Sequence, residues 1–237
     1  MKKLAVFYHL GAINSLWNKF VDEQLGLIKS SGLADVATVN MCYAAPDHAI
    51  NEIKIYVRQK YPFVNILSSR ILEGKGEQEN LFEGQTLKEL QTYSKTNDGY
   101  VLYIHSKGML HAINSHQTIP TRDWRHYMNY WCVERWNDCV QKLEDDQVDA
   151  VSTNWTRDPY PHFAGNFWWA TTDYIKTLPN VLDRSSYYDE KFTEKFEGHR
   201  FCYEVWMATN SPKVRSIHYS AIDHYYAPYP RERYVTV

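Results

Sequence analysis

The stretch YVLYIHSKG at residues 100–108 decides the fold class of this 237-residue chain. Its first five residues form a continuous apolar run bounded by polar residues, which is typical of a strand buried on both faces of a parallel sheet. His105, Ser106 and Lys107 follow this run directly, and a glycine after them permits a turn. Ligands of such sheets lie at the carboxyl ends of the strands, so these three residues are candidates for substrate binding.

Strands and helices alternate on both sides of that stretch. Apolar runs predict further strands at residues 3–9, 36–42, 64–68, 149–153, 166–170 and 213–219. Apolar residues at helical spacing predict helices at residues 15–29, 50–60, 86–94, 123–143, 172–178 and 199–209. This order predicts an α/β fold with a mostly parallel central sheet and helices on both faces. No linker or repeat interrupts it, so we expect a single domain over residues 1–237.

Composition excludes some classes of function. A formal net charge of −2 gives no long-range attraction for nucleic acid, and we expect no nucleic-acid partner. No apolar run reaches about 18 residues, so we expect no transmembrane segment. The four cysteines form no Cys-x-x-Cys pair, which favours buried, reduced thiols and a cytoplasmic location. Eight Trp and nineteen Tyr suit either the faces of sugar rings or a core rich in aromatic residues.

Lys107 has two interpretations. A cation beside the backbone N–H groups of a glycine turn can hold a diphosphate. A solvated turn whose lysine faces water explains the same residues equally well. The Gly-x-x-x-x-Gly-Lys phosphate loop is absent from the chain.

The segment PHFAGNFWWA at residues 161–170 is the most unusual in the chain. Adjacent side chains of a strand point to opposite faces, so Trp168 and Trp169 cannot both enter one core layer. We therefore expect one of them to face a cleft as a sugar platform, with Asn166 bonding a sugar hydroxyl. The alternative is that both tryptophans are buried between the sheet and its helices.

Carboxylates and histidines near the C-terminus offer further chemistry. Glu204 lies beside apolar residues of a predicted helix, where it acts as a general base at a cleft or pairs with Arg200. His218, Asp223 and His224 are candidate ligands of a divalent ion, although single histidines near strand ends are more often structural. Motifs of metalloproteases, serine hydrolases and classical dehydrogenases are absent.

Four segments together, LYIHSKG, RDWRHYMNYWCVERWNDCVQKL, HFAGNFWWATTDYIKTLP and YEVWM, resemble small glycosyltransferases of the GT-A fold, many of which are assigned to surface polysaccharide assembly. The resemblance covers residues 100–210. It implies a nucleotide-binding half at about 1–108 and an acceptor-binding half at about 109–237. It also implies transfer from a nucleoside-diphosphate sugar, UDP among the carriers, to a hydroxyl of a glycan or a lipid-linked saccharide.

The resemblance implies roles for individual residues. His9 would lie near the nucleotide base, and the strand from Asn166 to Trp169 would line the acceptor side. Glu204 would be the catalytic base of an inverting reaction, with Lys107 and Arg125 stabilising the leaving diphosphate.

One departure from the family concerns the metal. GT-A enzymes usually carry an Asp-x-Asp that binds Mn²⁺ or Mg²⁺, and this chain has none. Metal dependence stays open on that ground. Two alternatives to a glycosyltransferase also stay open, namely a non-catalytic carbohydrate-binding module and a sugar nucleotidyltransferase.

Overall fold

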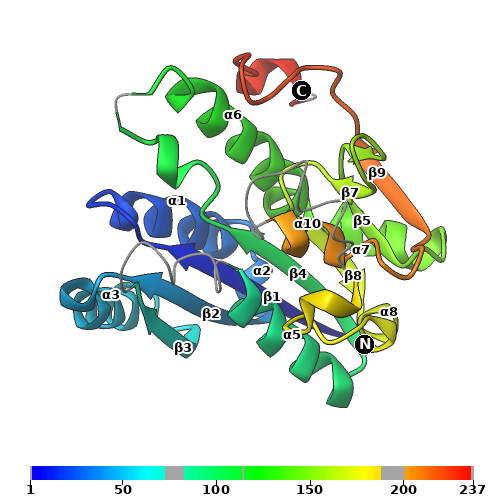
Figure 1. Cartoon of the computed structure of the whole chain (residues 1–237), viewed down its shortest axis with the longest axis horizontal. Coiled ribbons are helices and arrows are strands. Elements are labelled where there is room, and N and C mark those ends of the chain that lie inside the picture. The colour runs from blue at the N-terminus through cyan, green and yellow to red at the C-terminus, as the bar shows by residue number, and fades with distance from the viewer. Residues whose placement is uncertain (1, 73–82, 114, 188–200, 236–237) are drawn as a thin grey trace.

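The computed structural model describes residues 2–72, 83–113, 115–187 and 201–235 (Figure 1). Its central sheet has seven strands in the order β3-β2-β1-β4-β8-β5-β9. These strands are β1 (Lys3–Gly11), β2 (Ala37–Ala45), β3 (Val64–Ile71), β4 (Gly99–His105), β5 (Ala150–Thr153), β8 (Trp168–Thr171) and β9 (Val214–His218). A separate two-stranded ribbon joins β6 (Trp155–Thr156) to β7 (His162–Phe163). The predicted α/β fold with a mostly parallel sheet is confirmed.

The sheet is parallel except at one strand. β1 pairs in parallel with β2 and β4, and β5 pairs in parallel with β9. β8 runs antiparallel to both of its neighbours, β4 and β5. All seven residues of β4 are buried, which is the physical reason that its sequence is a continuous apolar run.

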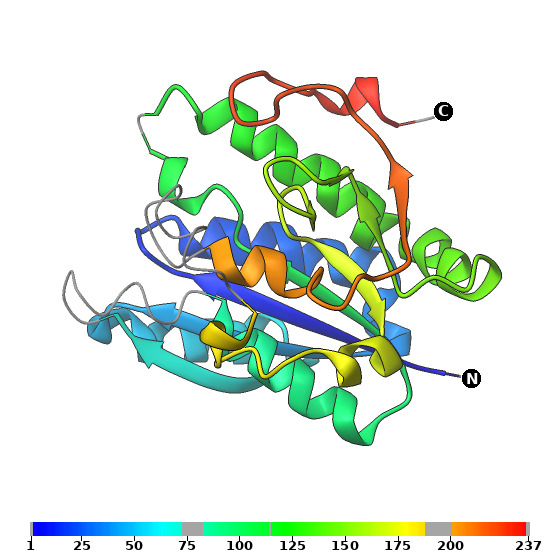
Figure 2. The same cartoon turned by 45° about the vertical axis from the view of Figure 1, so that its right-hand side comes forward.

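Helices cover both faces of the sheet (Figure 2). One face carries α1 (Trp17–Ser30), α3 (Asp47–Lys60), α6 (Thr118–Asn129), η3 (Tyr130–Glu134) and α7 (Trp136–Asp145). The other face carries α5 (Gly84–Thr96), α8 (Thr172–Thr177) and α10 (Cys202–Trp206). Short helices α2 (Leu33–Val36), η2 (Met109–His111), η4 (Arg184–Ser186) and η6 (Arg231–Arg233) complete the described chain.

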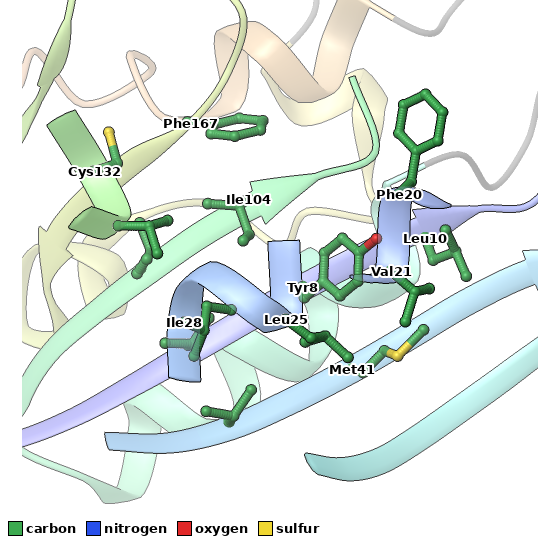
Figure 3. Packing of buried hydrophobic residues seen from close by; sticks show 14 of the residues in the cluster. Tyr8, Leu10, Phe20, Val21, Leu25, Ile28, Met41, Ile104, Cys132 and Phe167 are labelled. Atoms are coloured by element: carbon green, nitrogen blue, oxygen red, sulfur yellow. The ribbon is translucent and has the colours of Figure 1, made fainter. Parts of the chain in front are cut away.

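Each face has its own hydrophobic core. On the first face, Val21 and Leu25 of α1 pack against Tyr8 of β1 and Met41 of β2 (Figure 3). The second core lies between the sheet and α5, α8 and α10. The four cysteines are free and buried. Among the described residues, no helix is both long enough and apolar enough to cross a membrane.

The helix that the sequence predicts at 123–143 is interrupted. A π-helical turn at Tyr130–Glu134 separates α6 from α7, and Arg135 leaves helical geometry with φ −103° and ψ 32°. The carbonyl of Cys132 in this turn accepts a hydrogen bond from the indole N–H of Trp169 at 2.8 Å. A side chain that bonds a carbonyl of the helix in this way accounts for the local widening, which periodicity alone does not reveal.

Candidate functional site

A cavity of about 500 Å³ opens at the carboxyl ends of β1 and β4. Four of the residues that the sequence singles out line it together: His9, His105, Ser106 and Lys107. They meet because β1 and β4 run side by side in parallel, with His9 directly opposite His105. The cavity therefore lies at the edge of the sheet where the strand order predicts a ligand.

Hydrogen bonds from backbone and side chains fix the loop that follows β4. The N–H of Ser106 donates to the carbonyl of His9 at 2.9 Å, and the hydroxyl of Ser106 accepts from the N–H of Gly11 at 2.9 Å. Gln24 of α1 donates its side-chain amide to the carbonyl of His105 at 2.9 Å. These contacts hold the loops after β1 and β4 against each other, so the cavity wall is preformed.

His9 is an uncharged member of this wall. Its side chain is buried and its Nδ1 forms a hydrogen bond with Thr86 Oγ1 at 2.9 Å. Burial lowers the pKa of His9 to about 4 and outweighs the nearby Glu83 carboxylate, which acts in the opposite direction. His9 is therefore a neutral imidazole at neutral pH.

The two predicted cations differ in their surroundings, since Lys107 lines the cavity and Arg125 is buried behind it. The Lys107 ammonium lies over the Trp124 ring, 4.2 Å from its centroid. Arg125 is buried, and its Nε and Nη2 each donate to Glu23 at 2.7 Å. Its Nη1 donates to the carbonyl of Lys107 at 2.7 Å. The sequence predicts that Arg125 binds substrate, but all three of its guanidinium nitrogens already donate to protein acceptors, and its side chain is only 5% exposed.

The structure adds one carboxylate that sequence reasoning missed. Glu83 precedes α5 and lines the cavity. Its Oε2 accepts from the side-chain amide of Asn166 at 2.6 Å, and its Oε1 lies 3.4 Å from His105 Nδ1. Its charge adds to burial in raising the pKa of Tyr103 well above the ordinary value. The sequence does carry a signal for Glu83. It stands just before a predicted helix, and helices that follow strands begin at the ligand edge of such a sheet.

The GNFWW segment, residues 165–169, places Asn166 beside the cavity wall, but it does not expose a tryptophan. Trp168 is 1% and Trp169 0% exposed, and they belong to the cores on opposite faces of the sheet. The predicted alternation is confirmed. The prediction that one of the two rings faces a cleft is wrong, because helices cover β8 on both sides and bury both rings.

Glu204 lies on α10, on the same side of the sheet as Glu83. Its neighbour Tyr203 packs against Gly84, where an added Cβ would lie 2.5 Å from the Tyr203 hydroxyl oxygen. The charge of Glu204 contributes to raising the pKa of Tyr103. Glu204 is half-buried but is not part of the described cavity wall, and Arg200, its possible partner, lies outside the described residues.

The candidate metal ligands do not form a site. His218 bonds the Tyr127 hydroxyl at 2.9 Å and stacks on Trp131, while His224 stacks between Trp124 and Tyr127. Burial lowers the pKa of His224 to about 4. Asp223 accepts from the N–H of Tyr225 at 3.0 Å in an exposed turn. Across the described ranges no three His, Cys, Asp or Glu side chains are grouped as ligands of a metal ion, so the predicted trio is corrected to structural roles.

Comparison with solved structures finds distant similarities. A putative nucleotide-diphospho-sugar transferase from Desulfovibrio desulfuricans is 11% identical, with 92% of this chain and 81% of that chain covered at a TM-score of 0.40. A mannosyltransferase from Pyrobaculum calidifontis, solved with GDP-Man and Mn²⁺, is 14% identical at a TM-score of 0.45, with 75% of this chain and 48% of that chain covered. A 4-diphosphocytidyl-2C-methyl-D-erythritol synthase from Anaerococcus prevotii is 13% identical at a TM-score of 0.44, with 93% and 90% covered.

Among curated proteins there is no match. A family model does match nearly the whole chain, from residue 7 to residue 231. The chain therefore belongs to the family described as a domain of unknown function, DUF8361.

Proposed function

We propose that this protein is a glycosyltransferase of the GT-A kind, which moves a sugar from a nucleoside-diphosphate sugar to a hydroxyl of a glycan or lipid-linked saccharide. The cavity at the carboxyl ends of β1 and β4 carries the proposal. Its volume of about 500 Å³ lies within the ordinary range for small-molecule sites. Its wall combines a cation, a hydroxyl and a glycine turn, which suit a diphosphate.

The proposed reaction forms one bond, breaks one bond and transfers one proton. The acceptor oxygen forms a bond to the anomeric carbon while the bond from that carbon to the phosphate oxygen breaks. Glu204 takes the proton of the acceptor hydroxyl, and the nucleoside diphosphate leaves with its added negative charge near Lys107. Attack from the face opposite the leaving group inverts the anomeric configuration.

Arg125 has a positioning role in this proposal. It is anchored by Glu23 and holds the carbonyl of Lys107, so it fixes the loop that carries the ammonium group. We assign the nucleotide to the half formed by residues 1–108 and the acceptor to the half formed by residues 109–237, within one domain. A cytoplasmic role in polysaccharide assembly completes the proposal.

The described wall of the cavity is poor in ligands for a divalent metal. Glu83 is the one carboxylate in the described wall of the cavity, and it already accepts from Asn166 and lies against His105. Mg²⁺ and Mn²⁺ prefer several oxygen ligands, and this donor set does not fit a resident ion. The buried state of both tryptophans also argues against a carbohydrate-binding module, because neither ring is open to a sugar.

A thermal-shift screen with UDP, GDP and their sugars, with and without Mn²⁺, tests the proposal. A ligand at a hundred times its Kd stabilises the folded state by about 2.7 kcal/mol. Lys88→Ala is the matched control for Lys107→Ala, because Lys88 is an exposed lysine outside the cavity wall. The proposal expects stabilisation of the parent and the control and less for Lys107→Ala. No shift with any nucleotide, followed by no sugar transfer, would reject it.

A further inference from the structure

The GNFWW segment fixes the Glu83 side chain at the cavity wall. Asn166 donates its side-chain amide to Glu83 Oε2 at 2.6 Å, and its own side-chain oxygen accepts from the Trp168 indole at 2.9 Å. The Gly165 carbonyl accepts from His105 Nε2 at 3.0 Å. One turn of chain therefore holds both Glu83 and the histidine beside it.

The backbone of this turn is unusual in a way that serves those contacts. Gly165 has φ 89° and Asn166 has φ 58°, so two consecutive residues lie in the left-handed region. A side chain at Gly165 would place its Cβ 2.4 Å from the sulfur of Met128. Such conformations persist where the surrounding structure requires them, and they often mark functional sites.

Hydrogen bonding also orients the His105 ring toward Glu83. A carbonyl oxygen only accepts, so His105 Nε2 carries a hydrogen toward Gly165. The Nδ1 atom then faces the Glu83 carboxylate, which also only accepts, at 3.4 Å. This contact ties the Glu83 side chain to the same turn of chain that Asn166 provides.

The fixed Glu83 carboxylate can accept further hydrogen bonds. Its two oxygens offer about four acceptor sites, of which Asn166 takes one on Oε2, while His105 lies 3.4 Å from Oε1 and the Tyr103 hydroxyl is a further neighbour. The Glu83 side chain remains 15% exposed and lines the cavity. The complementary ligand groups are neutral donors, and two neighbouring hydroxyls of a sugar ring match the two oxygens of one carboxylate.

We propose that Glu83 is the acceptor that recognises a vicinal diol of the bound ligand, either the ribose of a nucleoside diphosphate or the sugar attached to it. Asn166 and His105 are positioning residues that hold this carboxylate. The inference rests on the proposed function, since it presumes a nucleotide-sugar ligand. This role for Glu83 explains why the GNFWW segment forms a turn with Asn166 beside the cavity. A sugar platform made of tryptophans does not explain it, because both rings are buried.

Calorimetric titration of the full chain tests the proposal. The probes are UDP and GDP, their 2′,3′-dideoxy forms, UDP-glucose and GDP-mannose. Glu83→Gln keeps the size of the side chain but removes the charged acceptor, and loss of such a bond weakens binding by roughly tenfold to a hundredfold. If ribose is the diol, the loss appears with UDP or GDP and vanishes with the dideoxy forms. If the transferred sugar is the diol, the loss appears only with the sugar-linked compounds.

Two further variants separate recognition from general damage. Glu89→Gln makes the same change on α5, the helix that follows Glu83, outside the cavity wall, and leaves every affinity unchanged. Asn166→Gly keeps the left-handed backbone but releases Glu83, so it lowers affinity several-fold for diol-bearing probes alone.

Three results would overturn the inference. Equal affinity of the parent and Glu83→Gln for all probes, or an equal loss for dideoxy and ribose forms, removes Glu83 as the diol acceptor while the proposed function stands. A parent that binds none of the probes overturns both.

Discussion

Replacement of Glu23 by glutamine removes the anchor of Arg125. The pKa shift of Glu23 gives the size of the expected loss in the free energy of unfolding. Burial alone raises the pKa of Glu23, but hydrogen bonds from Arg125 and His126 outweigh it and lower the pKa from 4.5 to about 2. One pKa unit corresponds to about 1.4 kcal/mol, so the shift is worth on the order of 3 kcal/mol at neutral pH. Removing one partner of a buried pair typically costs about 3–5 kcal/mol, which agrees.

The pH dependence of this contribution has a definite sign. The folded-state pKa of Glu23 lies below its unfolded value, so the stabilisation is present above about 4.5 and is lost as the pH falls toward about 2. Glu23→Gln has no such titration. The difference in the free energy of unfolding between parent and variant therefore shrinks across this window.

Urea denaturation followed by circular dichroism measures both effects. At pH 7 the variant is expected to lose about 3 kcal/mol, which lowers the melting temperature by about 6–12 °C for a chain of this size. Asp138→Asn is the control, because its salt bridge with Arg135 lies at the surface and such pairs contribute little. A loss below about 1 kcal/mol at pH 7, or a constant difference between pH 5 and pH 2.5, would refute the reasoning.

Three further predictions follow from the site and the core. Lys107→Ala should weaken nucleoside diphosphate binding several-fold without lowering the melting temperature, and unchanged affinity by calorimetry removes Lys107 from the site. Trp168→Ala and Trp169→Ala should each lower the free energy of unfolding by about 3–5 kcal/mol, because both rings are buried; a near-neutral change at either position in urea denaturation contradicts this. Glu204→Gln should lower kcat at least about a hundredfold with donor affinity nearly unchanged. Turnover within about threefold of the parent, or retention at the anomeric carbon by NMR, shows that Glu204 is not the base.

Much of the sheet could be predicted from the sequence. Buried parallel strands need apolar residues on both faces, so β1, β2 and β4 stand out as continuous runs. The amphipathic helices α1, α3 and α5 follow from apolar residues at helical spacing. The cavity lies where the sequence predicts a ligand, at the carboxyl ends of the strands, and His9 and His105 lie opposite each other near the ends of two neighbouring parallel strands.

Other features depend on contacts between distant segments. The antiparallel direction of β8 leaves no mark on its sequence, because a strand covered on both faces is apolar in either direction. The π turn at Tyr130–Glu134 depends on a hydrogen bond from Trp169. Glu83 gains its place from Asn166, which is 83 residues away in the chain. Long-range contacts of this kind also decided that both tryptophans are buried.

Hydrogen exchange of the backbone amides with and without UDP or GDP tests the central claim most directly. The account predicts slower exchange on nucleotide binding in residues 9–13 and 105–110, which surround the cavity at the carboxyl ends of β1 and β4. A second cavity, of about 580 Å³, lies at the opposite edge of the sheet near Gly99, Glu144 and Asp149 and serves as the internal comparison. Protection confined to that edge, or no protection at saturating nucleotide, would contradict the placement of the nucleotide site.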